Sequence, residues 1–135
     1  MIENPVFVYV DDDPISCRVM DMILRRGMHY EHVTIMQDST DFMDRIQALS
    51  PRPNVFLLDI RVDPIDGFEM LKLLQSNPDY AKSLFVAITA SVMSDEVDKL
   101  KDAGFDGGIS KPVKQRDFPE QMKALLSGES VWLIG

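Results

Sequence analysis

The sequence contains a single cysteine, Cys17, among its 135 residues. One thiol can form neither a disulfide framework nor a thiolate metal cluster, so we interpret Cys17 as a small apolar residue of a helix. Basic residues are also few, because 14 of them stand against 22 acidic residues, for a net charge of −8. That balance argues against a nucleic-acid partner, which would need a basic surface patch.

Long apolar segments are missing as well. No apolar run approaches the roughly 20 residues that span a bilayer. The first residues, 1–5, lack the basic and apolar regions of a signal peptide. The sequence therefore predicts a cytoplasmic protein without a membrane partner. Hydrophobic residues make up 45% of the chain, which is the usual globular share and suits one folded domain.

The run at residues 55–59 is the centre of the predicted fold. Four apolar residues precede one carboxylate, Asp59, without alternation between apolar and polar residues. Such a run is typical of a strand that is covered on both faces, as in a parallel sheet. Asp59 then falls at the carboxyl end of the strand, where open α/β sheets bind their ligands.

The remaining apolar runs predict four more strands, and the helical spacing of apolar residues between them predicts five helices. The strands are expected at 6–10, 32–36, 55–59, 84–88 and 105–109. The helices are expected to begin at caps and to end at breakers. The expected caps are Asp13, Ser39 and Asp66, a further helix is expected to start at Ser94 or Asp95 and the last one at Phe118, and the expected stops include Gly27, Asn77 and Gly104.

Alternation of strands and helices predicts an α/β fold with a doubly wound, five-stranded parallel sheet. The predicted domain covers residues 1–128. Residues 129–135 form an apolar tail outside the strand–helix pattern. This tail either packs on its own domain or contacts a partner, and the sequence favours neither alternative.

Polar residues follow four of the predicted strands. Because the carboxyl ends of parallel strands share one edge of the sheet, these side chains are expected to share a pocket. They are Asp11 and Asp12, Asp59, Thr89, and Lys111.

Three close carboxylates repel one another and need compensating positive charge. Lys111 offsets part of this charge, and Mg²⁺ suits the remainder because it binds carboxylates, water and phosphate oxygens. A carboxylate nucleophile can form an acyl phosphate, and phosphoryl transfer depends mostly on positioning and charge neutralisation. The pattern therefore indicates phosphoryl chemistry at this edge.

These residues resemble the signature of two-component response-regulator receiver domains of the chemotaxis-regulator type. The resemblance covers residues of about 5–127, and the intervals from Asp59 to Gly67, Thr89 and Lys111, which are 8, 30 and 52 residues, match the family. It implies a flavodoxin-like fold with strand order 2-1-3-4-5, an order that a receiver protein exemplifies. Because the chain ends soon after the last predicted helix, we expect a single receiver without an output domain.

The resemblance also implies a role for each residue. Asp59 would be the phosphoacceptor. Asp12, Asp11 and the main-chain carbonyl of Arg61 would hold Mg²⁺ together with Asp59. Thr89 and Lys111 would contact the phosphoryl group. The donor would be a sensor histidine kinase or a histidine phosphotransfer protein, and a downstream effector would read the change. The oligomeric state is left open.

Three positions depart from the family pattern. Gly108 stands where the family usually has an aromatic residue, so the usual rotation of that ring cannot occur in this form. Asp63 replaces the usual proline after the phosphoacceptor, with Pro64 one residue later. Arg61 places a long cation at a position that influences loss of the phosphoryl group in the family.

Other functions remain alternatives. A receiver-fold interaction module that works without phosphorylation is one, motivated by Gly108. A haloacid-dehalogenase-like phosphatase is another, because Asp11 and Asp13 have its two-residue spacing, although Pro14 follows at once and the cap segment is missing. A flavin carrier of the same topology is disfavoured, because the acidic residues 11–13 would repel the flavin's phosphate.

Overall fold

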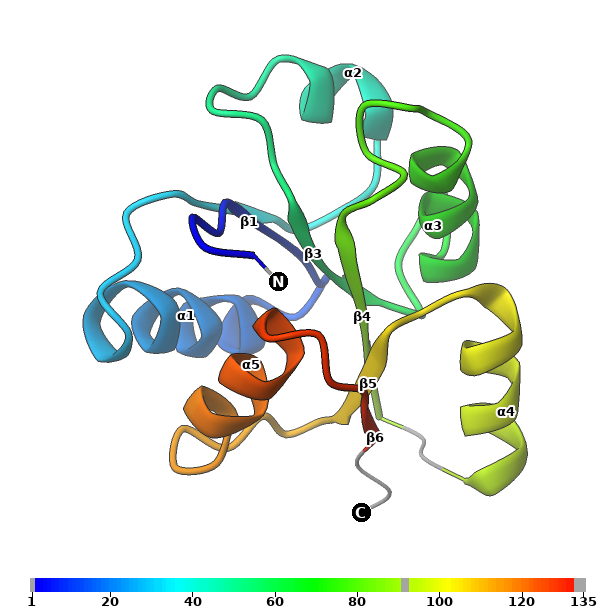
Figure 1. The fold of residues 1–135 in the computed structure, drawn as a ribbon. Helices are drawn as coiled ribbons and strands as arrows, with labels where there is room; N and C mark the ends of the chain where they lie inside the picture. The colour runs from blue at the N-terminus through cyan, green and yellow to red at the C-terminus, as the bar shows by residue number, and fades with distance from the viewer. Residues whose placement is uncertain (1, 91–92, 133–135) are drawn as a thin grey trace.

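The computed structural model describes residues 2–90 and 93–132, which form a parallel sheet with helices on both faces (Figure 1). The sheet has six strands in the order β2-β1-β3-β4-β5-β6. Their bounds are β1 Phe7–Val10, β2 Val33–Met36, β3 Val55–Asp59, β4 Leu84–Thr89, β5 Gly107–Ser110 and β6 Val131–Trp132. The predicted fold class and the order of the first five strands are confirmed.

Two layers of helices enclose the sheet. Helices α1 and α5 cover one face, and α2, α3 and α4 cover the other (Figure 1). Their bounds are α1 Pro14–Met22, α2 Phe42–Gln47, α3 Gly67–Gln75, α4 Ser94–Ala103 and α5 Phe118–Leu126. No helix among the described residues is long and apolar enough to pass through a bilayer.

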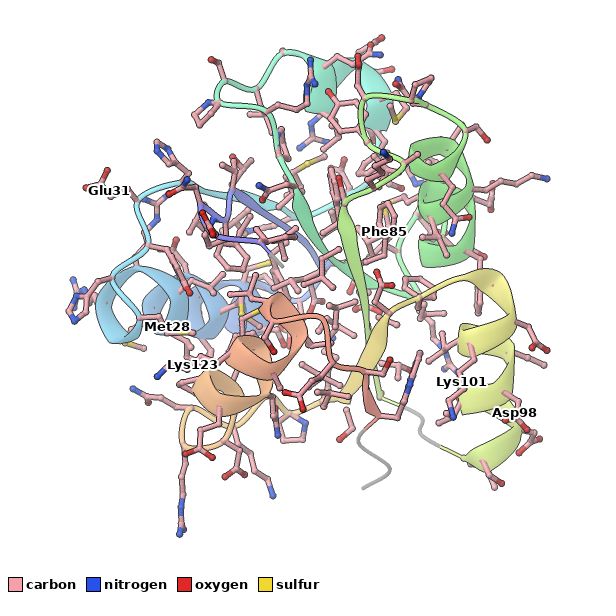
Figure 2. The ribbon with its side chains drawn as sticks, viewed as in Figure 1. Met28, Glu31, Phe85, Asp98, Lys101 and Lys123 are labelled. Atoms are coloured by element: carbon pink, nitrogen blue, oxygen red, sulfur yellow. The ribbon has the colours of Figure 1, made fainter. Side chains whose placement is uncertain are left out.

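The three central strands are buried along their whole length, as their unbroken apolar runs predict. Successive side chains of β1 alternate between the two faces. Phe7 and Tyr9 belong to the core under α1 and α5, whereas Val8 and Val10 belong to the core on the other face. Phe85 of β4 belongs to this second core and lies between the sheet and α3 (Figure 2).

Most predicted helix ends are confirmed. The Asp13 side chain accepts a hydrogen bond from the amide of Ile15 at 3.1 Å and caps α1. The Asp66 side chain accepts one from the amide of Glu69 at 2.9 Å and caps α3. Gly104 ends α4 with φ = 107°, a left-handed conformation that glycine adopts without a steric penalty. These ends fix the loops that lead into and out of the sheet.

One predicted cap is wrong. Ser39 does not cap α2, because its hydroxyl is buried and is bonded instead to the distant residue Ile65. Helix α2 begins at Phe42, after Asp41 in a left-handed conformation with φ = 49°. The first helical segment ends at Gly27 as predicted, but its last turn is not α-helical. Residues Ile23–Gly27 form a π-helical turn, closed by a bond from the amide of Met28 to the carbonyl of Ile23.

The tail contributes a sixth strand that the sequence did not predict. Val131 pairs with Gly107 and Trp132 pairs with Gly108, in parallel with β5. The predicted count of five strands is therefore one too low, since a two-residue strand has no periodicity to detect. The described part of the tail packs on its own domain, and residues 133–135 lie outside the described residues.

Candidate phosphoryl and metal site

Three carboxylates gather at the carboxyl edge of the sheet. Asp11 and Asp12 follow β1, and Asp59 ends β3, which pairs directly with β1. One carboxylate oxygen from each lies within 4.8 Å of the others. Asp11 and Asp59 are buried, whereas Asp12 is exposed. The edge therefore has a buried acidic floor and an open side that a small cation can approach.

Lys111 joins the two buried acids. It follows β5, two strands away from β3, and its side chain is 19% exposed. Its Nζ lies 3.0 Å from Oδ2 of Asp11 and 3.0 Å from Oδ2 of Asp59. Burial alone would lower the pKa of Lys111, but the hydrogen bonds and charges of the two aspartates outweigh it and raise that pKa. The lysine is therefore a stable cation.

Asp11 is held by contacts that the sequence analysis missed. The hydroxyl of Tyr9 donates to Oδ2 of Asp11 at 2.6 Å, and the amide of Asp13 donates to Oδ1 at 3.0 Å. The thiol of Cys17 donates to the main-chain carbonyl of Asp11 at 3.1 Å. Burial and the Asp11 hydrogen bond raise the pKa of Tyr9, so its hydroxyl remains a donor. The available signal was that Tyr9 and Asp11, two residues apart, share one face of the strand.

Asp59 is placed between two donors. Its Oδ1 accepts a hydrogen bond from the main-chain amide of Arg61 at 2.9 Å, and its Oδ2 accepts one from Lys111. Burial raises the pKa of Asp59, and these two donors act against that rise. The Arg61 side chain is exposed, and its backbone lies in the loop that leaves Asp59. This loop brings the Arg61 backbone next to the carboxylate.

Thr89 ends β4, at the same edge of the sheet. Its side chain is buried, and its main-chain carbonyl accepts a hydrogen bond from the amide of Lys111 at 2.8 Å. A pocket of about 160 Å³ opens beside it, between the β3–α3 loop and α4. The pocket is lined by Ile60, Arg61, Phe68, Thr89, Glu96, Lys99 and Leu100.

The structure thus brings four of the predicted residues into one cluster, namely Asp11, Asp12, Asp59 and Lys111, with Thr89 on the same edge. Three carboxylates and one ammonium leave a surplus of negative charge. Carboxylate oxygens are hard ligands, so the donor set fits Mg²⁺. Asp13 does not join the cluster as an acid, because its carboxylate caps α1 and accepts from the Ser16 hydroxyl.

Comparison with known proteins finds relatives along most of the chain. A family model described as the response regulator receiver domain matches residues 7–123. Response regulator Rcp1 of Synechocystis sp. is 28% identical over 137 residues, which cover 96% of this chain and 91% of Rcp1. Stress response regulator protein 1 of Meyerozyma guilliermondii is 27% identical over 106 residues, and the match spans only 48% of that protein. The chain thus spans about half the length of some of its relatives.

Solved structures share the fold. The chemotaxis response regulator CheY4 of Vibrio cholerae superimposes with a TM-score of 0.81 at 18% identity, over 92% of this chain and 100% of that chain. The Mn²⁺-bound form of response regulator Rcp1 has a TM-score of 0.73 at 25% identity, over 92% of this chain and 93% of that chain.

Proposed function

We propose, on the premise that this chain belongs to the response regulator receiver domain family, that Asp59 accepts a phosphoryl group from a phosphohistidine. Family members are signalling proteins rather than classical enzymes. The observation that carries the proposal is the position of Lys111, whose Nζ contacts the carboxylates of Asp11 and Asp59 at once. A cation fixed there neutralises charge on an incoming phosphoryl group as well as on the two acids.

The transfer itself needs a nucleophile and a leaving group. A carboxylate oxygen of Asp59 attacks phosphorus, the bond between phosphorus and the donor imidazole nitrogen breaks, and the imidazole leaves as the neutral ring after it takes up a proton. Lys111 stabilises the negative charge on the equatorial oxygens, and the hydroxyl of Thr89 donates a hydrogen bond to one of them. Asp59 thereby becomes an acyl phosphate.

Mg²⁺ would be held by the carboxylates of Asp11, Asp12 and Asp59 and by the main-chain carbonyl of Arg61. The approach of the three carboxylates within 4.8 Å and the open side at Asp12 support this assignment. The Mn²⁺-bound form of the relative Rcp1 supports a divalent cation. When bound, the cation would neutralise phosphate oxygens that the single lysine cannot reach.

The proposed partners follow from this chemistry. The donor is a sensor histidine kinase or a histidine phosphotransfer protein, and a downstream effector protein reads the phosphorylated state. We expect neither nucleic acid nor a membrane among the direct partners, given the net charge of −8. The proposed setting is the cytoplasm.

Intact mass measurement tests the proposal. The protein is incubated with acetyl phosphate and Mg²⁺, and the parent is compared with Asp59→Asn. We expect the parent to gain the mass of one phosphoryl group and the variant to gain none. Chelation of Mg²⁺ with EDTA should abolish the gain in the parent. A gain that persists in Asp59→Asn would refute the assignment of Asp59.

A second candidate is an interaction module that is not switched by phosphorylation. Gly108 favours it, because the ring that usually responds in the family is missing from β5. This candidate predicts that a partner binds the parent equally well before and after treatment with acetyl phosphate. Mg²⁺ binding without any phosphoryl uptake would also favour it.

A further inference from the structure

The side chain of Trp132 covers the glycine that breaks the family pattern. A Cβ atom built at Gly108 would lie 3.2 Å from Cε3 and 3.3 Å from Cζ3 of the Trp132 ring. It would also lie 3.4 Å from Cδ1 of Leu100, which belongs to α4. The indole ring therefore rests directly on the backbone of β5, where the Cβ atom of any other residue at position 108 would press against it.

The neighbouring residue, Gly107, leaves room for the backbone of the tail strand. A Cβ atom at Gly107 would lie 2.9 Å from the main-chain carbonyl oxygen of Val131 and 2.7 Å from Cδ2 of Leu125. Both positions of β5 that pair with β6 are thus glycines, and both make room for the tail. Val131 packs on the core under α1 and α5, whereas Trp132 packs on the core of the opposite face.

Helix α4 supplies the rest of the binding site for the ring. Nζ of Lys101 lies 5.4 Å from the centroid of the Trp132 ring, a cation–π distance. Figure 2 shows Lys101 on α4, on the side turned toward the tail strand, and Figure 1 shows β6 at the edge of the sheet beside β5. The ring is therefore held between a strand and a helix that meet at the edge of the sheet.

The same helix reaches the candidate phosphorylation site. Leu100 lines the pocket beside Thr89 and also lies over Gly108 next to the indole ring. In the sheet, Gly108 pairs with Ala87, two residues before Thr89. Leu100 thus borders both the pocket at Thr89 and the site occupied by Trp132.

We propose that the tail strand β6 is a regulated cover: Trp132 docks over Gly108 in the unphosphorylated protein, and phosphorylation of Asp59 releases it. The inference rests on the proposed function. Thr89 and Leu100 line the same pocket, so a phosphoryl group that bonds to the hydroxyl of Thr89 is expected to displace Leu100. The face of α4 that carries Leu100 and Lys101 would then no longer fit the ring. The tail is suited to release, because only two of its described residues pair with β5 and both are half-buried.

Release would uncover the edge of β5 and the adjoining face of α4. That surface is apolar at Leu100 and carries unpaired backbone groups of β5, so it fits an effector protein that adds an extended segment to the sheet edge. The effector and the tail would then compete for one site.

The fluorescence of Trp132 tests the release directly, because it is the single tryptophan of the sequence. Emission, acrylamide quenching and intact mass are measured on one sample before and after acetyl phosphate and Mg²⁺. We expect phosphoryl uptake together with a shift of the emission to longer wavelengths and stronger quenching. Asp59→Asn should show none of these changes.

The two possible failures differ in their readouts. Phosphoryl uptake without any change in emission or quenching overturns the regulated cover and leaves the proposed function standing. Absence of phosphoryl uptake refutes the proposed function, and the cover with it.

A pair of variants tests the docking without phosphorylation. Gly108→Val puts side-chain atoms where the ring lies, so it should shift the emission to longer wavelengths in the unphosphorylated protein. Gly27→Ala is the matched control, because the nearest atom to a Cβ there is 4.0 Å away. Should Gly108→Val fail to fold, Lys101→Gln removes the cation near the ring and should also shift the emission. An unchanged spectrum in the folded variants overturns the docking.

Discussion

At the scale of single residues, the ammonium group of Lys111 offsets part of the negative charge of the candidate site. It is the cation that contacts both buried acids, while Tyr9 and the amide of Asp13 hold Asp11 in place. A buried carboxylate without a cationic partner is costly, and Asp59 is already a group whose pKa is raised by burial. The lysine therefore stabilises the resting site and is also poised to contact an incoming anion.

Replacement of this lysine gives the first prediction. Lys111→Ala should slow phosphoryl uptake from acetyl phosphate by about 100-fold, the effect typical of a lost charge-stabilising donor. The rate is measured as the gain of intact mass with time at saturating Mg²⁺. Lys99→Ala is the matched control, because Lys99 lines the pocket at Thr89 without an ion pair to the acids among the described residues. Equal rates for Lys111→Ala and the parent would contradict the role of the lysine.

Asp106 and Asp38, which are not part of the carboxylate cluster, are predicted to change the pH dependence of stability in opposite directions. Burial raises the pKa of Asp106, although its side chain accepts a hydrogen bond from the amide of Phe85. The folded protein therefore binds the proton of Asp106 more tightly than the unfolded chain does, and its contribution to stability is lost as the pH rises through this pKa. Asp106→Asn keeps an acceptor for Phe85, so its stability relative to the parent should rise between acidic and neutral pH.

The control for this experiment is Asp38. Hydrogen bonds from Thr40 and then Arg45 lower the pKa of Asp38, so its contribution to stability is present at neutral pH and is lost as the pH falls through the lowered pKa. Asp38→Asn should therefore lose stability relative to the parent as the pH rises. Urea unfolding midpoints of the three proteins from acidic to neutral pH check both signs, and parallel curves would contradict the prediction.

At the scale of elements, the β3–α3 loop determines the position of the phosphoacceptor. Its amide at Arg61 binds Asp59, and Ser39 anchors its far end by donating to the carbonyl of Ile65 at 2.6 Å and accepting from the amide at 2.9 Å. The loop closes at Gly67, whose amide donates to the carbonyl of Ile60. Its backbone is thus tied at three points around the candidate site.

Gly67 offers a test of this closure. A Cβ atom there would lie 2.8 Å from Cα of Ile60 and 2.9 Å from the carbonyl oxygen of Asp59, so the backbone would have to move. Gly67→Ala should lower the free energy of unfolding by about 1–3 kcal/mol, the usual cost of overpacking. It should also slow phosphoryl uptake, because the backbone of Asp59 is displaced. Urea unfolding and intact mass measure the two effects.

The matched control is again Gly27→Ala, which meets no atom closer than 4.0 Å. It should keep or slightly raise the stability, because alanine favours a helix over glycine. If both alanine variants were equally stable, the tight closure at Gly67 would not hold.

At the scale of the whole molecule, the carboxylates at the carboxyl edge of the sheet repel one another, and a bound cation would reduce that repulsion. The chain has a net charge of −8, and three of its carboxylates converge within 4.8 Å. A ligand that binds only the folded state raises stability with its concentration. The proposed Mg²⁺ site is therefore expected to affect the stability of the entire domain.

Addition of Mg²⁺ should raise the free energy of unfolding by about 2.7 kcal/mol at roughly 100 times the dissociation constant. Thermal unfolding with increasing MgCl₂, compared with NaCl of equal ionic strength, measures the effect. Asp12→Asn, which removes the exposed ligand, should reduce it. Equal shifts with both salts would mean that general screening, rather than a bound cation, is responsible.

The sequence pattern by itself determined the fold class and the edge where the polar residues meet, and the resemblance to the receiver family supplied the order of the first five strands. Buried parallel strands can be predicted from short apolar runs such as the one before Asp59. The alternation of strands and helices then leaves few topologies possible. The caps at Asp13 and Asp66 could be predicted for the same reason, since capping is a contact between near neighbours.

Only the tertiary structure decided the contacts between distant parts of the chain. Ser39 binds Ile65 instead of its own helix, Lys101 lies over the ring of Trp132, and that ring packs against Gly108. Each of these contacts depends on which segments pack side by side, and no local periodicity records that choice. The contact between Trp132 and Gly108, the position that departs from the family pattern, exists only in the folded chain.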